Sequence, residues 1–183
     1  MSVRRRKVYT MKIVTMKALH YLLFVLLIFV TLDAEGKKYP FNIDRTYNIN
    51  VCRSTVAGTK MVKVTAYGKS ADAAIDQAMV DAVAALTFFG ADGSGEMENC
   101  PAMLYDGKDC YSQNKQFFDN FFKKGQFMDF VEKVNSGYPL GEDNVKTPKG
   151  RRIKILLIVH WDALADFYKK NGFKTIISEL GNY

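Results

Sequence analysis

The fold of this chain is decided by residues 62–90, VKVTAYGKSADAAIDQAMVDAVAALTFFG, which predict a strand followed by an amphipathic helix. From Val62 to Ala66, apolar residues alternate with polar ones, the period-two pattern of a sheet with one buried face. Gly68 ends the strand, and Ser70 is placed to cap the helix that follows. Small apolar residues then recur every three or four positions, so we expect the helix to lie close against the strand.

Two segments on either side of this unit also have patterns of regular structure. Apolar residues alternate with polar ones from Tyr47 to Cys52, which predicts a first strand in an antiparallel hairpin with the Val62 strand. Phenylalanines at helical spacing predict a helix between residues 114 and 135, kinked or split at Gly125. Residues 138–150 contain two prolines and predict a polar connection.

The C-terminal part predicts a strand, a short helix and an edge strand. Ile153–Val159 is the most apolar run after residue 34 and is interpreted as a central strand, buried on both faces at its end. Asp162 is expected to cap a helix that stops at Gly172, and residues 173–180 are expected to add an edge strand. Residues 35–183 therefore predict a single α+β domain, in which helices pack on one face of a small, mainly antiparallel sheet.

Residues 90–116 read as a glycine-rich loop insertion that carries two of the three cysteines. In an exported chain, a disulfide is the default state of such cysteines. Cys100 and Cys110 are the favoured pair because their bridge would close a short flexible loop, although Cys52 could replace either partner. The chain has no C-x-x-C motif, which argues against a thiol-redox role.

The formal net charge of +7 is concentrated at the N-terminus. Residues 1–34 contain six Lys or Arg and one acid, so residues 35–183 hold 20 basic and 18 acidic side chains. A nucleic-acid-binding domain carries its excess positive charge in the folded part. The nearly neutral remainder of this chain argues against nucleic acid as a partner.

The first 34 residues have the pattern of a signal peptide with a basic n-region. Their apolar segment, Ala18–Leu32, has fifteen residues, fewer than the roughly 20 that a membrane-spanning helix needs. Cleavage is expected after Ala34, and Met16 is an alternative start because a complete signal peptide begins there. The chain is therefore expected in the periplasm or at the outer membrane of a bacterium. The alternative is an uncleaved segment that anchors it in the membrane.

After residue 34, we find no recognisable catalytic, cofactor-binding or metal-binding pattern in the sequence. His160 is the one histidine of this part, and the partners of a catalytic triad or a zinc site are not in evidence around it. Gly68-Lys69-Ser70 lacks the upstream glycine of a phosphate-binding loop, since position 63 is lysine. These patterns predict a protein that is not an enzyme and has no cofactor.

Two groups of residues are candidates for a contact surface. Phe118, Phe122 and Phe127 belong to a dense phenylalanine cluster, whose helical spacing favours the core first. So many phenylalanines nevertheless leave room for an exposed share that would contact a partner. Arg151 and Arg152 belong to the longest basic run after the leader and are the polar candidates for the same surface.

The unit at residues 62–90 resembles the LPP20-like domain, which also forms the N-terminal part of the flagellar assembly protein T. The resemblance rests on a strand that ends at Ala66-Tyr67-Gly68 and on a helix in which Ala74, Ala78, Asp81 and Ala82 follow an A-x-x-x-A-x-x-D-A rhythm. It implies a non-catalytic module that binds or assembles with other components of the bacterial envelope. Many members are lipoproteins, whereas this chain lacks a lipidation box, and it carries a cysteine-bearing insertion.

The sequence therefore predicts an exported, non-catalytic envelope protein that acts through protein–protein contacts. Its partners would be envelope proteins or further copies of itself, and membrane contact would be made only through the leader. Two alternatives stay open. One is a small exported hydrolase that uses carboxylates, and the other is a membrane protein tethered by an uncleaved N-terminal segment.

Overall fold

The structure is a computed structural model that describes residues 37–52 and 56–176. These residues belong to one compact unit, Lys37–Tyr183. The predicted leader, the cleavage after Ala34 and the alternative start at Met16 lie outside the described residues.

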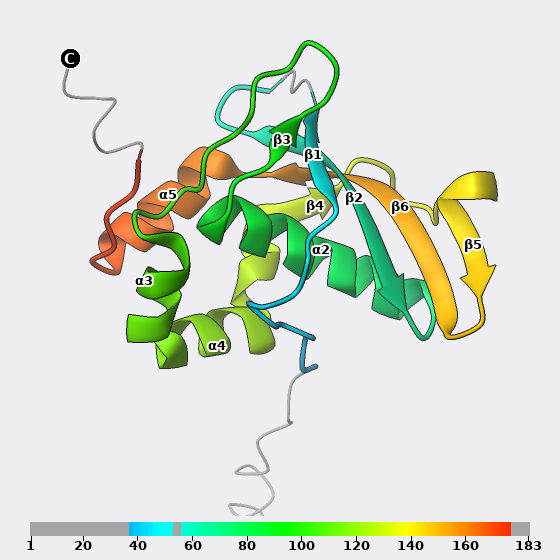
Figure 1. Ribbon diagram of the computed structural model, residues 1–183, viewed down its shortest axis with the longest axis horizontal. Helices are drawn as coiled ribbons and strands as arrows, with labels where there is room; N and C mark the ends of the chain where they lie inside the picture. Colours follow the sequence, from blue (N-terminus) through cyan, green and yellow to red (C-terminus); the bar gives the residue numbers. More distant parts are fainter. Residues whose placement is uncertain (1–36, 53–55, 177–183) are drawn as a thin grey trace, which may run out of the picture. The chain divides into compact units, whose positions relative to one another are not determined.

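The described residues form one sheet with helices packed against it (Figure 1). In chain order the elements are β1 (Ile49–Cys52), β2 (Lys60–Gly68), α2 (Ala71–Phe88), β3 (Asp92–Gly93), α3 (Gly107–Gln113), α4 (Lys115–Lys123), the 3-10 helix η1 (Gln126–Phe130), β4 (Val131–Lys133), the 3-10 helix η2 (Gly141–Asp143), β5 (Asn144–Thr147), β6 (Gly150–Val159) and α5 (Trp161–Lys170). The strand order is β3-β1-β2-β6-β4, and β5 also pairs with β6. Every pairing is antiparallel except that of β1 with β3. The predicted α+β class with a mainly antiparallel sheet is confirmed.

Strand β2 and helix α2 form the predicted strand–helix unit. Val62, Val64 and Ala66 of β2 are completely buried, and Figure 1 shows α2 running along one face of the sheet. The Oγ of Ser70 accepts a hydrogen bond from the amide of Ala73 (3.2 Å) and so caps α2. Both features arise between residues close in the chain, which is why the sequence pattern predicts them well.

Strand β6 is central, as predicted, and pairs with β2 from Arg151 to Val159. Its residues alternate in burial: Ile155 and Leu157 face the helices, whereas Leu156 is 37% exposed on the other face. Ile158, near the end of the strand, is also only half-buried, so the expectation that the strand is buried on both faces at its end is wrong. Helix α2 covers only the face to which Ile155 and Leu157 point, so apolar side chains that point the other way stay accessible.

The phenylalanine-rich segment is not one helix. Helix α4 ends at Lys123, η1 follows, and Val131 begins strand β4. The cause is Gly125, which has a φ of +85° and lies so close to Tyr39 that a Cβ would be 2.7 Å from its ring. A residue with a side chain would be strained there, and the left-handed conformation turns the chain out of the helical path.

Two stretches that the sequence predicts as loops contain regular structure. Residues 90–116 hold β3 and α3, and residues 138–150 hold η2 and β5. Strands as short as β3 and β5 have too few residues to show a period, so only their pairing with β1 and β6 defines them.

The C-terminal elements also differ in detail from the prediction. Helix α5 begins at Trp161, so Asp162 lies in its first turn and is not its cap. Of the edge strand expected over residues 173–180, the described part shows an isolated bridge between Thr175 and Leu104, and residues 177–180 lie outside the described part.

Candidate functional site

In the described part of the chain, the strongest candidate for a partner-binding surface lies at a gap along one edge of β6. Strand β4 pairs with Leu157 to Val159, and β5 pairs with Gly150 to Ile153. Residues 154–156 in between are paired with neither strand on this side. The connection between β4 and β5 passes this gap and leaves a cavity of about 370 Å³. We call it the edge groove, and its main lining residues are Lys63, Tyr138, Pro139, Leu140, Lys154 and Leu156.

Large apolar side chains are exposed around the edge groove. Leu140 is 83% exposed, Tyr138 is 53% exposed, and Leu156 forms part of the floor. Val134 is also exposed, and its amide donates to the carbonyl of Leu156 (3.2 Å), so it lies beside the groove. Four of the nine exposed large apolar residues in the described chain therefore gather at one place. A concentrated apolar patch with a polar rim marks an interaction site more often than scattered exposed residues do.

The polar rim of the edge groove is mainly basic. Lys63 is the cross-strand neighbour of Leu156, and Lys154 is the neighbour of Thr65 on the same outer face. Asp143 is the one acid among the lining residues, and its Oδ1 lies 4.0 Å from the Nζ of Lys154. The hydroxyl of Tyr138 donates a hydrogen bond to Asp72 at the start of α2, which ties the groove wall to the body of the domain.

The edge groove does not follow from the sequence patterns described above. Residues 138–150 have the pattern of a polar connection, and the apolar run 153–159 predicts a strand that is buried on both faces at its end, although the alternation in β6 is a usable signal of an outer face. Lys154 marks the outward face of this strand, and Leu156 and Ile158 share its parity. An apolar residue that points to the same face of the strand as a lysine indicates that the outer face is partly apolar.

The phenylalanines that the sequence predicts as contact residues belong to the core. Phe118, Phe122 and Phe127 are completely buried, so the proposed contact role for them is wrong. The ring of Phe122 stacks on that of Phe41 at 4.2 Å between centroids, and Phe118 packs edge-on against Phe88 of α2 at 4.9 Å. A phenylalanine stripe is expected to pack on any apolar surface available, and here α2 and the N-terminal segment provide one.

The two arginines that the sequence predicts at the contact surface are half-buried. Each donates a hydrogen bond that helps to hold β5 or η2 in place. Arg151 donates from Nη1 to Oδ1 of Asn144 (2.8 Å), and Arg152 donates from Nη2 to the carbonyl of Glu142 (3.3 Å). One donor of each arginine therefore supports the neighbouring strand or 3-10 helix, whereas the Nε of Arg152 is buried without a hydrogen-bond partner. A contact role for the two arginines stays a prediction.

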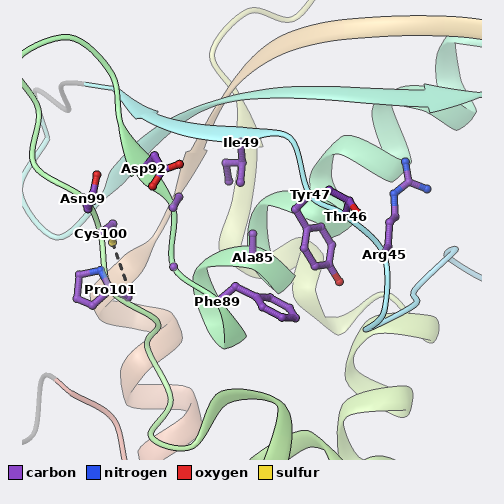
Figure 2. Close-up of a pocket in the computed structure, with 12 residues that line it drawn as sticks. Arg45, Thr46, Tyr47, Ile49, Ala85, Phe89, Asp92, Asn99, Cys100 and Pro101 are labelled. Atoms are coloured by element: carbon purple, nitrogen blue, oxygen red, sulfur yellow. Dashed lines mark hydrogen bonds between the residues drawn. The ribbon is translucent and has the colours of Figure 1, made fainter.

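A second cavity, of about 610 Å³, lies between β1 and the C-terminal end of α2. Figure 2 shows the rings of Tyr47 and Phe89 together on one side, with Asp92 and Asn99 on the other. The Oδ1 of Asn99 already accepts from the amide of Gly93 (2.9 Å), and Phe89 is the one exposed large apolar residue among the lining residues of this cavity. The edge groove is therefore the better candidate for a partner site.

Asp81 is a buried carboxylate in the middle of α2. Its side chain is 1% exposed, accepts from Nε2 of Gln77 (2.7 Å) and lies 3.4 Å from Nε of Arg45. Burial raises the pKa of Asp81 to about 6, and Arg45 and Gln77 oppose that rise. A hydrolase would need such a carboxylate in contact with its substrate, whereas Asp81 is enclosed, so it does not favour the hydrolase alternative.

The three cysteines are free thiols in this structure, and no two of them lie at disulfide distance. Cys100 is buried, and Cys52 and Cys110 are half-buried. The favoured Cys100–Cys110 bridge is therefore absent, because α3 carries Cys110 away from the strand-like bridge that Cys100 makes with Ala91.

We expect three alkylated thiols when the protein is denatured without a reductant and its mass is measured. In the native state, Cys100 should react at least about tenfold more slowly than Cys52, because burial blocks access and also raises the pKa of Cys100. A product that is two hydrogens lighter and carries one alkyl group would contradict the free-thiol structure and restore the predicted bridge.

Comparisons with family models, with characterised proteins and with solved structures gave no match. The resemblance of residues 62–90 to the LPP20-like domain therefore stays a prediction. None of the helices in residues 37–52 and 56–176 is long and apolar enough to cross a membrane.

Proposed function

We propose that this chain is an exported, non-catalytic binding or assembly module that acts through protein–protein contacts in the bacterial envelope. The observation that carries the proposal is the edge groove, where Leu140, Tyr138 and Leu156 are exposed beside two lysines. Hot spots of protein interfaces are centred on such apolar and aromatic anchors within a polar rim.

Export is the second part of this proposal and is supported by the leader. Its fifteen-residue apolar segment and basic flank suit a signal peptide that is cleaved after Ala34. An uncleaved leader would keep the same domain at the membrane, so the binding role does not depend on which form the cell contains.

A photocrosslinking residue at position 140 is expected to capture one or a few discrete envelope proteins, or a second copy of this chain, in living cells. Leu140 is the most exposed large apolar side chain of the described residues. Combining the probe with Leu156→Asp should lower the yield about tenfold, equivalent to about 1.4 kcal/mol of binding free energy. Mass spectrometry of the crosslinked bands provides the measurement.

The matched control carries the same probe at Tyr105, which is also exposed but lies far along the chain from the groove residues. Crosslinks that form equally at both positions would show that contacts at the groove are not specific. A chain that forms no crosslink at position 140 and sediments as a monomer would reject the proposed function.

A further inference from the structure

The backbone at the edge groove is arranged to accept another strand. Residues 154–156 of β6 lie between the segments paired with β4 and β5, and of their backbone groups the carbonyl of Leu156 already accepts a hydrogen bond from the amide of Val134 (3.2 Å). An unpaired stretch at the edge of a sheet is a template for the backbone of an extended peptide. The gap is three residues long, so it suits a short segment and not a long strand.

The hydrogen-bond pattern of the sheet shows which residue presents its backbone to the gap. The amide of Thr65 donates to the carbonyl of Asn48 (2.9 Å), so the backbone groups of Thr65 point toward β1 and not toward β6. In an antiparallel pair, the partner of such a residue points its own groups the opposite way. The partner of Thr65 is Lys154, whose backbone N–H and C=O therefore face the edge groove.

The side chains around the gap define the chemistry of the segment. Leu156 and Leu140 supply apolar surface, and Lys63 and Lys154 supply two positive charges against the single negative charge of Asp143. The excess positive charge is complementary to carboxylates that flank an apolar residue.

We propose that the edge groove binds a short, extended, acidic segment of a partner protein, which pairs with the edge of β6 at Lys154. An apolar side chain of the segment packs on Leu156 and Leu140, and carboxylates two residues before and after it, on the same face of the segment, lie against Lys63 and Lys154. This inference rests on the proposed function, because it names the chemistry of the partner that the groove contacts.

The probe is a capped, fluorescently labelled heptapeptide with leucine at its fourth position, glutamate at its second and sixth positions and serine elsewhere, so that one face carries the leucine and both carboxylates. It is titrated with the purified full chain and followed by anisotropy. A peptide with lysine in place of every glutamate is the matched control. We expect saturable binding of the acidic peptide, and at least about tenfold weaker binding of the basic one. Equal binding of both peptides would overturn the charge argument.

Variants test the two lysines. Lys63→Glu combined with Lys154→Glu should weaken binding of the acidic peptide at least about tenfold. The control pair Lys124→Glu and Lys170→Glu makes the same change in net charge at exposed positions of other elements and should leave binding within about twofold. Since Lys154 is half-buried, Lys63→Glu alone keeps the test usable if the double variant unfolds.

Backbone pairing is tested by N-methylation of single residues in the acidic peptide. Methylation of the peptide residue opposite Lys154 should abolish binding, and methylation of the residue on either side of it should not, because only the residue opposite Lys154 points its N–H at the strand edge. Tolerance of methylation at every position would overturn the strand-addition geometry.

Sedimentation with vesicles of phosphatidylcholine containing phosphatidylglycerol separates a lipid surface from a peptide partner. Binding to these vesicles that is lost in Lys63→Glu, with no binding of the acidic peptide, would overturn the proposal in favour of a membrane contact. Crosslinks at position 140 without peptide binding would reject only this inference. Peptide binding without envelope crosslinks would support it and reject the envelope role.

Discussion

Replacing Phe122 with alanine is expected to destabilise the domain by about 3–5 kcal/mol. The side chain is completely buried and packs between rings of three other segments, with Phe41 stacked on it at 4.2 Å and Phe127 and Phe88 about 6 Å away. Its removal would leave a cavity that these neighbours can fill only partly. The midpoint and free energy of urea-induced unfolding measure the effect.

The matched control is Phe89→Ala at the next position after α2. Phe89 is 42% exposed, so we expect its loss to cost at most about 1 kcal/mol. Comparing the stabilities of the two variants shows whether the phenylalanine cluster belongs to the core or to a contact surface. If Phe122→Ala unfolded at the wild-type urea concentration while crosslinking at the envelope was lost, the buried arrangement of α4 would be contradicted.

Replacing Asp81 with asparagine is expected to stabilise the protein at pH 7.5 and to remove part of its pH dependence. Burial raises the pKa of this carboxyl from 3.8 to about 6, so the folded state holds a proton more tightly than the unfolded state does. The contribution of the Asp81 carboxyl to the free energy of unfolding is greatest below pH 3.8 and falls as the pH rises through about 6. The penalty at pH 7.5 amounts to at most about 3 kcal/mol.

Asparagine keeps an oxygen that can accept the hydrogen bond from Gln77, and it carries no charge to bury. Arg45 loses its ionic partner, but its side chain is about one-third exposed and water can solvate it. The gain in unfolding free energy over the wild type should therefore be near zero at pH 4, grow as the pH rises through about 6 and level off above that.

The measurement is urea-induced unfolding of both proteins across this pH range, since other titrating groups cancel in the difference. Asp166→Asn is the control, because its carboxylate is 66% exposed, and its difference from the wild type should change little with pH. A variant at Asp81 that is less stable than the wild type at every pH would mean that the ion pair with Arg45 outweighs the cost of burial.

Local interactions explain how much of the fold the sequence could predict. The alternation in β2, the alanine-rich α2 and the serine cap at Ser70 all depend on residues within one or two turns of each other. Periodicity and capping are properties of the adjacent chain, so these elements can be recognised without knowing what packs on them. The α+β class followed from these elements and from the strong strand at β6.

The candidate site depends on contacts between distant parts of the chain. Strands β4 and β5 are too short to have a recognisable period, and only their places along β6 create the gap at residues 154–156. The apolar residues of β6 and of the phenylalanine cluster looked alike in sequence, since each recurs at the period of its element. Helix α2 buries Phe122 and leaves Leu156 exposed. The sequence around each residue does not show which of the two will be buried.

The sequence by itself determined the strand–helix unit at residues 62–90, because hydrogen bonding and hydrophobic periodicity act between near neighbours. The tertiary structure alone decided which face of the sheet is covered, where the edge of β6 is open and that Asp81 meets Arg45. Burial and charge pairing are set by whichever surfaces the folded chain brings together, so they appear only when distant segments have packed.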